Sequence, residues 1–107
     1  MHIESIRDFC LSFDDVEESF PFGDDTLVFK TKGKIFLLLS LNTEELRFNV
    51  KCDPQEAIEL RERYASITPG WHMNKKHWNT IIVDGELPAS LIKEQIQNSY
   101  WLVRGKR

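Results

Sequence analysis

The spacing of apolar residues predicts an amphipathic helix at each end of the chain. The first helix covers residues 3–13, and the last one opens at Pro88. In both, apolar side chains recur every three or four residues, which places them on one side of a helix. These side chains are Ile3, Ile6, Cys10 and Phe13 in the first helix, and Ile92, Ile96, Tyr100 and Val103 in the last.

Between these helices the pattern is that of strands. In the first strand Leu27 and Phe29 point to one face and Lys30 to the other, and Lys32-Gly33 then makes a tight hairpin turn. The next strand is nearly all apolar, as expected of a central strand covered on both faces. The strands are predicted over residues 26–32, 34–41, 46–51 and 80–83, and a shorter extended piece covers residues 18–23.

A middle helix is predicted to begin at Asp53, which can cap it, with Pro54 in the first turn. Its apolar stripe is narrow and consists of Ala57, Leu60 and Tyr64. The order of helices and strands, with hairpin-length connections, predicts an α+β fold in which an antiparallel sheet carries helices packed on one face. A chain of 107 residues makes this a single domain, residues 1–107.

Composition narrows the setting in which the chain works. The longest apolar run, Ile35 to Leu39, is far shorter than the roughly 20 residues of a membrane-spanning helix, so no membrane association is expected. The N-terminus lacks the pattern of a signal peptide, so we expect a cytoplasmic protein. We also expect a monomer. Cys10 and Cys52 are then expected to be reduced and buried.

Charge is unevenly distributed along the chain, whose net charge is -3. Up to Phe29 there are eight acidic residues and one base, Arg7; from Lys30 onward bases outnumber acids. An acidic cluster of this kind is either solvated surface or a site for a hard cation. The cluster consists of Asp14, Asp15, Glu17, Glu18, Asp24 and Asp25.

The segment Thr68–Thr80 has the composition of a binding surface. Its thirteen residues hold two Trp, two His, two Lys and two Asn, and no acidic residue. Aromatic rings beside cations suit contact with phosphates, bases or an acidic partner. The competing interpretation is that Trp71 and Trp78 belong to the core, which is where tryptophan is more often found.

Basic residues on the predicted strands can extend such a surface, although lysines on a sheet face often only solubilise it. Arg104, Lys106 and Arg107 add charge at the C-terminus. The residues predicted to bind nucleic acid are Lys30, Lys32, Lys34, Arg47, Lys51, Trp71, Asn74, Lys75, Lys76, His77, Trp78 and Asn79.

No arrangement of residues predicts catalysis or a cofactor. The sequence has no Ser-His-Asp or Cys-His pattern, and its glycines are isolated rather than grouped in a phosphate-binding loop. His72 and His77 lack the further ligands that zinc needs. We therefore expect neither an enzyme, nor a cofactor, nor a metal held by this pair.

Four motifs together resemble the MmcQ/YjbR family of small bacterial proteins. They are Phe20-Pro-Phe-Gly23, Lys34-Ile-Phe36, Pro69-Gly-Trp-His-Met-Asn-Lys-Lys-His-Trp-Asn79, and Ser99-Tyr100 followed by Leu102-Val103. The resemblance implies a CyaY-like (frataxin-like) α/β sandwich and a DNA-binding role, and it singles out residues 74–79. In one departure, Asp14-Asp15 stands where the family has a Leu-Pro-Gly-like helix exit, which makes a DNA-facing first helix less favourable.

These observations give one preferred hypothesis and two alternatives. The preferred hypothesis is weak, sequence-independent binding of DNA through a basic sheet face and the Trp/His/Lys segment. The alternatives are frataxin-like iron binding by the acidic cluster, and a protein–protein adaptor. Exposure of Trp71 and Trp78 would favour the first hypothesis, and burial of both would favour the adaptor.

Overall fold

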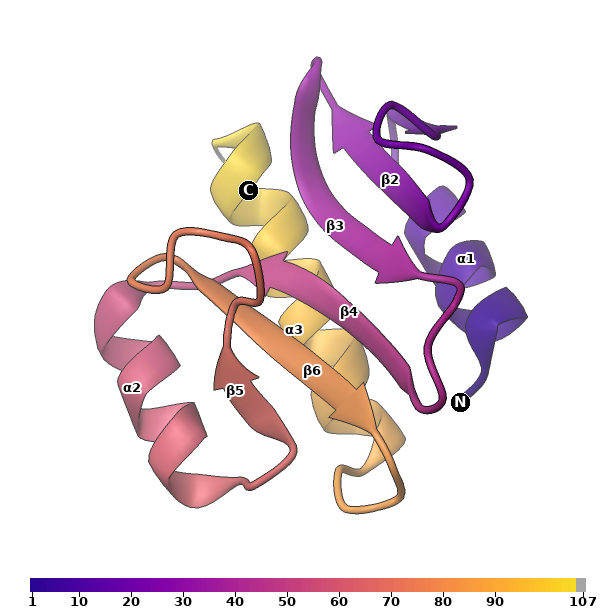
Figure 1. Ribbon diagram of the computed structural model, residues 1–107. Helices are drawn as coiled ribbons and strands as arrows, with labels where there is room; N and C mark the ends of the chain where they lie inside the picture. Colours follow the sequence, from indigo (N-terminus) through magenta and orange to yellow (C-terminus); the bar gives the residue numbers. More distant parts are fainter. Residues whose placement is uncertain (106–107) are drawn as a thin grey trace.

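The computed structural model describes residues 1–105, which form three helices and a six-stranded sheet. Figure 1 shows α1 and α3 behind one face of the sheet and α2 beside its β5 edge. In chain order the elements are α1 (Ile3–Leu11), β1 (Val16–Ser19), β2 (Thr26–Thr31), β3 (Lys34–Ser40), β4 (Leu46–Lys51), α2 (Pro54–Arg63), β5 (Ile67–Pro69), β6 (Trp78–Val83) and α3 (Ala89–Arg104).

The sheet is antiparallel throughout, with the strand order β1-β2-β3-β4-β6-β5. The first four strands follow one another as neighbours. After β4 the chain passes through α2 to the edge strand β5 and returns as β6 between β4 and β5 (Figure 1). The α+β fold with an antiparallel sheet is therefore confirmed. No helix in the described part of the chain is long and apolar enough to cross a bilayer.

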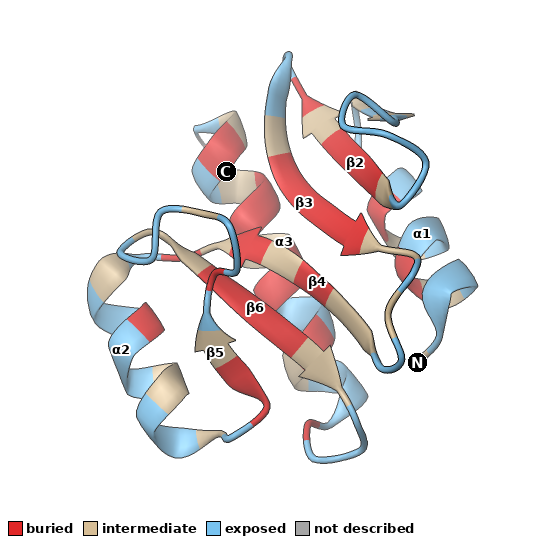
Figure 2. Ribbon diagram, viewed as in Figure 1, coloured by how far each residue is buried: buried red, intermediate tan, exposed pale blue. Residues whose placement is uncertain are grey.

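The hydrophobic core lies between the sheet and the helices α1 and α3. Leu27 and Phe29 of β2 face it, as the alternation predicted, and Tyr100 of α3 packs edge-on against Phe36. In Figure 2 the middles of the central strands are buried, whereas the loops in front of the sheet are exposed. The four apolar positions predicted for the last helix, Ile92, Ile96, Tyr100 and Val103, are all buried in this core.

The predicted ends of the elements are correct within a few residues. Asp53 caps α2 by accepting hydrogen bonds from the backbone N–H groups of Gln55 and Glu56. The first helix ends at Leu11 rather than at Phe13, because Phe13 leaves the helix to stack on Tyr100 with ring centroids 4.6 Å apart. Its apolar spacing thus reflects core packing beyond the end of the helix.

The hairpin turn predicted at Lys32-Gly33 is confirmed, since both residues have positive φ, 52° and 77°. Immediately after it, β3 contains a bulge. Lys30 pairs with Ile35 and Phe29 with Leu37, so Phe36 is the extra residue. The bulge interrupts the alternation within β3, so the consecutive residues Phe36 and Leu37 both belong to the hydrophobic core.

Candidate functional site

A groove lies on the sheet face that points away from α1 and α3. Its volume is about 390 Å³. The floor comes from β2, β3 and β4, and the walls come from the loop 20–25 and the loop 70–77, which lie in front of the sheet in Figure 1. The groove is lined by Phe22, Thr26, Leu38, Ser40, Arg47, Asn49, Trp71, His72 and Met73.

Aromatic side chains form its two walls. Phe22 and Trp71 are 65% and 51% exposed, although they are among the largest apolar side chains of the protein. The imidazole of His72 stacks on the Trp71 ring with centroids 4.8 Å apart. Leu38 and neighbouring Val28, on the same face, are buried, so this face has an apolar centre, as the nearly all-apolar sequence of β3 predicted.

Arg47 supplies the positive charge of the groove. Its guanidinium carbon lies 4.9 Å from the centroid of the Trp71 ring, within the range of a cation–π contact. One of its nitrogens is 3.5 Å from a carboxylate oxygen of Glu45. Its Nε is buried and has no hydrogen-bond partner within residues 1–105. The guanidinium therefore retains capacity to bind a further acceptor.

A short hydrogen-bond chain fixes the backbone of Trp71 on the sheet. The Trp71 N–H donates to Thr80 Oγ1 over 3.0 Å, and its carbonyl accepts from Asn49 Nδ2 over 3.1 Å. The Thr80 hydroxyl in turn donates to Asn49 Oδ1. Because both the oxygen and the nitrogen of the Asn49 amide make these contacts, this side chain positions Trp71.

Arg61 of α2 holds the rest of the loop 70–77 in place through hydrogen bonds. Its side chain donates to Asn79 Oδ1 over 2.7 Å and also to the carbonyls of Lys75 and Trp78. The Lys75 ammonium donates to the Gly70 carbonyl over 2.8 Å. The loop is thus tied both across itself and to α2.

These contacts change the roles predicted for the motif residues 74–79. Asn79 is fully buried and Lys75 closes the loop. Asn74 accepts a hydrogen bond from the Lys76 N–H through its side chain. These three side chains therefore make hydrogen bonds that hold the loop, although Asn74 and Lys75 are exposed, as Lys76 is, and His77 and Trp78 are partly buried. Of the predicted tryptophans, Trp71 is the one that lines the groove.

The predicted basic face divides between the two sides of the sheet. Lys30 and Lys51 share the face of Arg47, as their strand positions require. Lys34 pairs with Thr31, whose hydroxyl accepts from Arg104 of α3, so the register of the hairpin places Lys34 toward the helix side. Lys32 lies at the hairpin tip. A single surface carrying all these lysines was expected, and in this respect the expectation is wrong.

Phe22, His72 and Met73 line the groove but were not among the predicted binding residues. A signal for them was present in the sequence. Phe22 belongs to the Phe20-Pro-Phe-Gly23 motif, and His72 and Met73 belong to the segment that contains Trp71. The fold brings these two motifs, far apart in the chain, to opposite walls of one groove.

The acidic cluster is dispersed over a helix exit, a strand and a loop. Arg7 binds Glu18 with an N–O distance of 2.5 Å, and this hydrogen bond lowers the pKa of the Glu18 carboxyl. Asp15 lies 3.7 Å from Arg104. No three His, Cys, Asp or Glu side chains among the described residues are placed to hold a metal ion. Lys106 and Arg107, noted for their charge, lie outside these residues.

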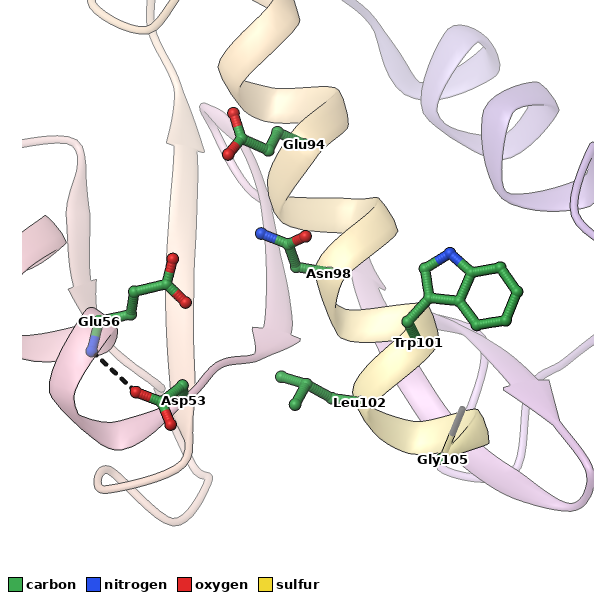
Figure 3. A pocket seen from close by; sticks show the side chains of 7 residues that line it. All are labelled: Asp53, Glu56, Glu94, Asn98, Trp101, Leu102 and Gly105. Carbon is green, nitrogen blue, oxygen red and sulfur yellow. Dashed lines mark hydrogen bonds between the residues drawn. The ribbon is translucent and has the colours of Figure 1, made fainter. Parts of the chain in front are cut away.

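A second hollow lies between the start of α2 and the end of α3 (Figure 3). Three carboxylates, from Asp53, Glu56 and Glu94, lie around it, and Asp53 is engaged as the cap of α2. Trp101 and Leu102 add apolar surface. Its charge is opposite to that of the groove, so this hollow does not suit a phosphate.

The two cysteines are unsuited to nucleophilic chemistry. Cys10 and Cys52 are both free and buried, as predicted. Burial raises the pKa of the Cys52 thiol to about 11, and burial raises the pKa of Cys10 above the usual thiol range. Since the thiolate is the reactive form, both thiols are inert at neutral pH.

Comparison with known proteins places the chain among bacterial relatives. The family model YjbR matches residues 11–102. The uncharacterized protein YbdF of Escherichia coli O157:H7 is 40% identical over 104 residues, covering 94% of this chain and 82% of YbdF. The uncharacterized protein YjbR of Escherichia coli strain K12 is 27% identical over 100 residues, covering 94% of this chain and 85% of that protein.

Solved structures agree with the fold. The crystal structure of the Deinococcus radiodurans protein DR2400, with a DUF419 domain, has a TM-score of 0.92 at 40% identity and covers 97% of this chain and 79% of that one. A crystal structure of a Pseudomonas syringae protein has a TM-score of 0.84 at 27% identity, covering 97% of this chain and all of the other, 100%.

Proposed function

The chain belongs to the YjbR family, and we propose that it binds nucleic acid weakly, and independently of sequence, through the sheet face that carries the groove. The observation that carries this proposal is the half-exposed Trp71 with the Arg47 guanidinium over its ring. An exposed ring beside a cation offers a stacking surface and a phosphate contact at one place.

The surroundings of Trp71 support this function. Lys30 and Lys51 lie on the same face as Arg47, outside the groove lining, and can contact phosphates beyond the groove. Lys76 is exposed on the loop that carries Trp71. The net charge of -3 keeps the affinity low and makes it sensitive to salt, because the remaining surface repels a polyanion.

Binding is preferred to catalysis as the role of this face. Arg47 and Trp71 provide charge and stacking, and neither is a general base or a nucleophile. The buried thiols of Cys10 and Cys52 cannot serve in their place. The side chain of the groove that could act as a general base is His72, and its ring is stacked on Trp71.

The two alternatives have less support. Iron binding by the acidic cluster loses its geometric basis, since Glu18 and Asp15 are paired with arginines. The CyaY-like description of the fold, which motivated it, stays an expectation of the family resemblance. The adaptor hypothesis was tied to burial of both tryptophans, and Trp71 is exposed.

The test is an NMR titration of the labelled protein with a short DNA of random sequence, at low salt and at about 0.15 M, where the Debye length is about 8 Å. We expect saturable shifts around Lys30, Arg47, Lys51 and the loop 70–77, weakening with salt. The double substitution Lys30→Glu and Lys51→Glu should abolish them.

Each of the two substitutions made singly, Lys30→Glu or Lys51→Glu, should already weaken binding, and Lys34→Glu is their matched control, because it makes the same charge change toward the helix side of the sheet. Lys34→Glu should retain binding. The absence of shifts at low salt would refute the proposal, as would an equal loss of binding in Lys34→Glu and in the other two single variants.

A further inference from the structure

We infer that the groove takes a single unpaired nucleotide from a single-stranded nucleic acid, with its base between Phe22 and Trp71 and its phosphate beside Arg47. This inference rests on the proposed function and specifies its ligand. The residues that carry it belong to three separate parts of the chain: the loop 20–25, β4 and the loop 70–77.

The shape of the site favours an unpaired base. The volume of about 390 Å³ is in the range of pockets that enclose a small molecule, roughly 300–1,000 Å³. The bases of a duplex are paired and stacked on each other, so a duplex cannot insert a single base into such a groove. A single strand can turn one base out and stack it on an aromatic side chain.

The aromatic walls favour a planar ring. Phe22 keeps most of its surface exposed and Trp71 keeps about half. Exposed apolar surface is unfavourable in water unless a ligand covers it. His72 stacked on Trp71 and the guanidinium of Arg47 both limit the positions that the indole can adopt. A base entering the groove therefore meets a platform that is already ordered.

Arg47 favours an anion next to that ring. Its Nε is buried without a hydrogen-bond partner in the described part of the chain, and its contact with Glu45 is a long 3.5 Å. The Arg47 side chain is 25% exposed, so a phosphate contacts the accessible part of the guanidinium rather than the buried Nε. The planar guanidinium also fits a phosphate in two-point contact, which a lysine cannot provide.

The groove does not contain a set of free amides that would identify the base. Asn49 hydrogen-bonds Trp71 and Thr80 through its amide, and the other uncharged polar groups of the lining are the hydroxyls of Thr26 and Ser40, the His72 imidazole and the Trp71 indole N–H. Stacking then dominates recognition. We expect purines to bind more tightly than pyrimidines because their rings overlap more, with little further discrimination.

The experiment compares four probes at low salt: a short oligo-dA strand, the same strand without bases, the corresponding duplex, and AMP. Binding is followed by NMR shifts of the loop 70–77 and by tryptophan fluorescence. We expect oligo-dA to bind at least tenfold more tightly than the baseless strand and the duplex, in line with the stacking contribution of one base.

Phe22→Ala should weaken oligo-dA binding about tenfold, as expected for loss of one stacking partner. Phe20→Ala is the matched control, since Phe20 is also exposed, at 50%, in the same loop but does not line the groove. Arg47→Lys should weaken binding although the charge is kept. Both phenylalanines are surface residues, so these variants should fold.

The outcomes separate the inference from the function on which it rests. Equal binding of oligo-dA, baseless strand and duplex would overturn the single-nucleotide inference while leaving nucleic-acid binding in place. Binding of AMP without binding of the strand would also overturn it, and would identify a free nucleotide as the ligand. Failure of every probe to bind would refute the proposed function itself.

Discussion

Gly70 and Trp78 approach each other so closely that no side chain fits between them. The Gly70 N–H donates a 2.8 Å hydrogen bond to the Trp78 carbonyl. A Cβ atom added at Gly70 would lie 2.7 Å from the Cβ of Trp78 and 2.9 Å from its carbonyl oxygen. This contact closes the base of the loop 70–77 and thereby sets where Trp71 lies.

Replacing Gly70 by alanine should therefore move the loop. We expect Gly70→Ala to lower the free energy of unfolding by about 1–3 kcal/mol, because the new methyl group can be accommodated only by a backbone shift. Urea denaturation measures the loss, and NMR shifts of the Trp71 and Thr80 amides report the displacement. Gly85→Ala is the comparison: nothing lies within 4 Å of its added Cβ, and its strain comes from φ of +97° alone. Unchanged loop amides in Gly70→Ala would contradict this account.

The Ser99 side chain of α3 bridges β3 and β4 at the point where these two strands separate. Its hydroxyl donates to the Phe36 carbonyl over 2.5 Å and accepts from the Lys51 N–H over 2.8 Å. We expect Ser99→Ala to lower the free energy of unfolding by about 1–3 kcal/mol, because two buried backbone groups lose this partner. Ser90→Ala, an exposed site on the same helix, should have little effect. Equal stability of the two variants in urea denaturation would contradict this role of Ser99.

Stability should depend on pH through Ser66 and Asp84. The Ser66 hydroxyl donates to both carboxylate oxygens of Asp84, over 2.7 and 2.9 Å, and this lowers the pKa of that carboxyl below its ordinary 3.8. A carboxyl whose pKa is lower in the folded state stabilises the fold above its unfolded pKa, and this contribution is lost as pH falls.

Removing the hydroxyl should raise the Asp84 pKa in Ser66→Ala, as NMR titration of the carboxyl would show. The stability difference between the parent protein and Ser66→Ala should be largest near neutral pH. This stability difference should narrow as pH falls below 3.8, the ordinary pKa of the carboxyl. It should narrow further as pH falls through the lower pKa that Asp84 has in the folded state. A difference that stays constant, or widens, toward acid pH would contradict the linkage.

The hairpin tip offers a stabilising substitution. Lys32 has a φ of 52°, which strains a residue with a long side chain, whereas asparagine adopts this conformation more readily. We expect Lys32→Asn to raise the free energy of unfolding by about 0.5 kcal/mol by creating the Asn-Gly pair preferred in such turns. Lys34→Asn makes the same charge change on a strand and should not stabilise the protein. If thermal unfolding shows the same gain in both variants, the backbone explanation is wrong.

Several elements could be predicted from the sequence because their patterns are local. The alternation in β2 and β4 identifies one buried face, and the unbroken apolar run of β3 identifies a strand covered on both faces. The turn at Lys32-Gly33 and the cap at Asp53 depend on residues adjacent in the chain. Each of these signals is complete within a few residues, so tertiary packing did not alter it.

The strands β1 and β5 were harder to predict. β5 comprises the three residues Ile67–Pro69, too few for an alternating pattern, and it exists because β6 offers it hydrogen-bond partners. The extended piece predicted over residues 18–23 shares only its first two residues with β1, because this strand runs over Val16–Ser19. At both edges of the sheet, pairing with a neighbour defines the strand, and a neighbour is not visible in a local pattern.

By itself, the sequence determined an α+β fold and most of its strands and helices, and it predicted Trp71 and Arg47 as binding residues. Only the tertiary structure decided that these two residues line one groove with Phe22, and that Asn79 and Lys75 make hydrogen bonds that hold the loop. The register of the hairpin, in which Thr31 pairs with Lys34 and Lys30 with Ile35, places Lys30 and Lys34 on opposite faces of the sheet. The physical reason is that periodicity reports how each segment meets the core, whereas a groove depends on how separate loops fold over the same strands.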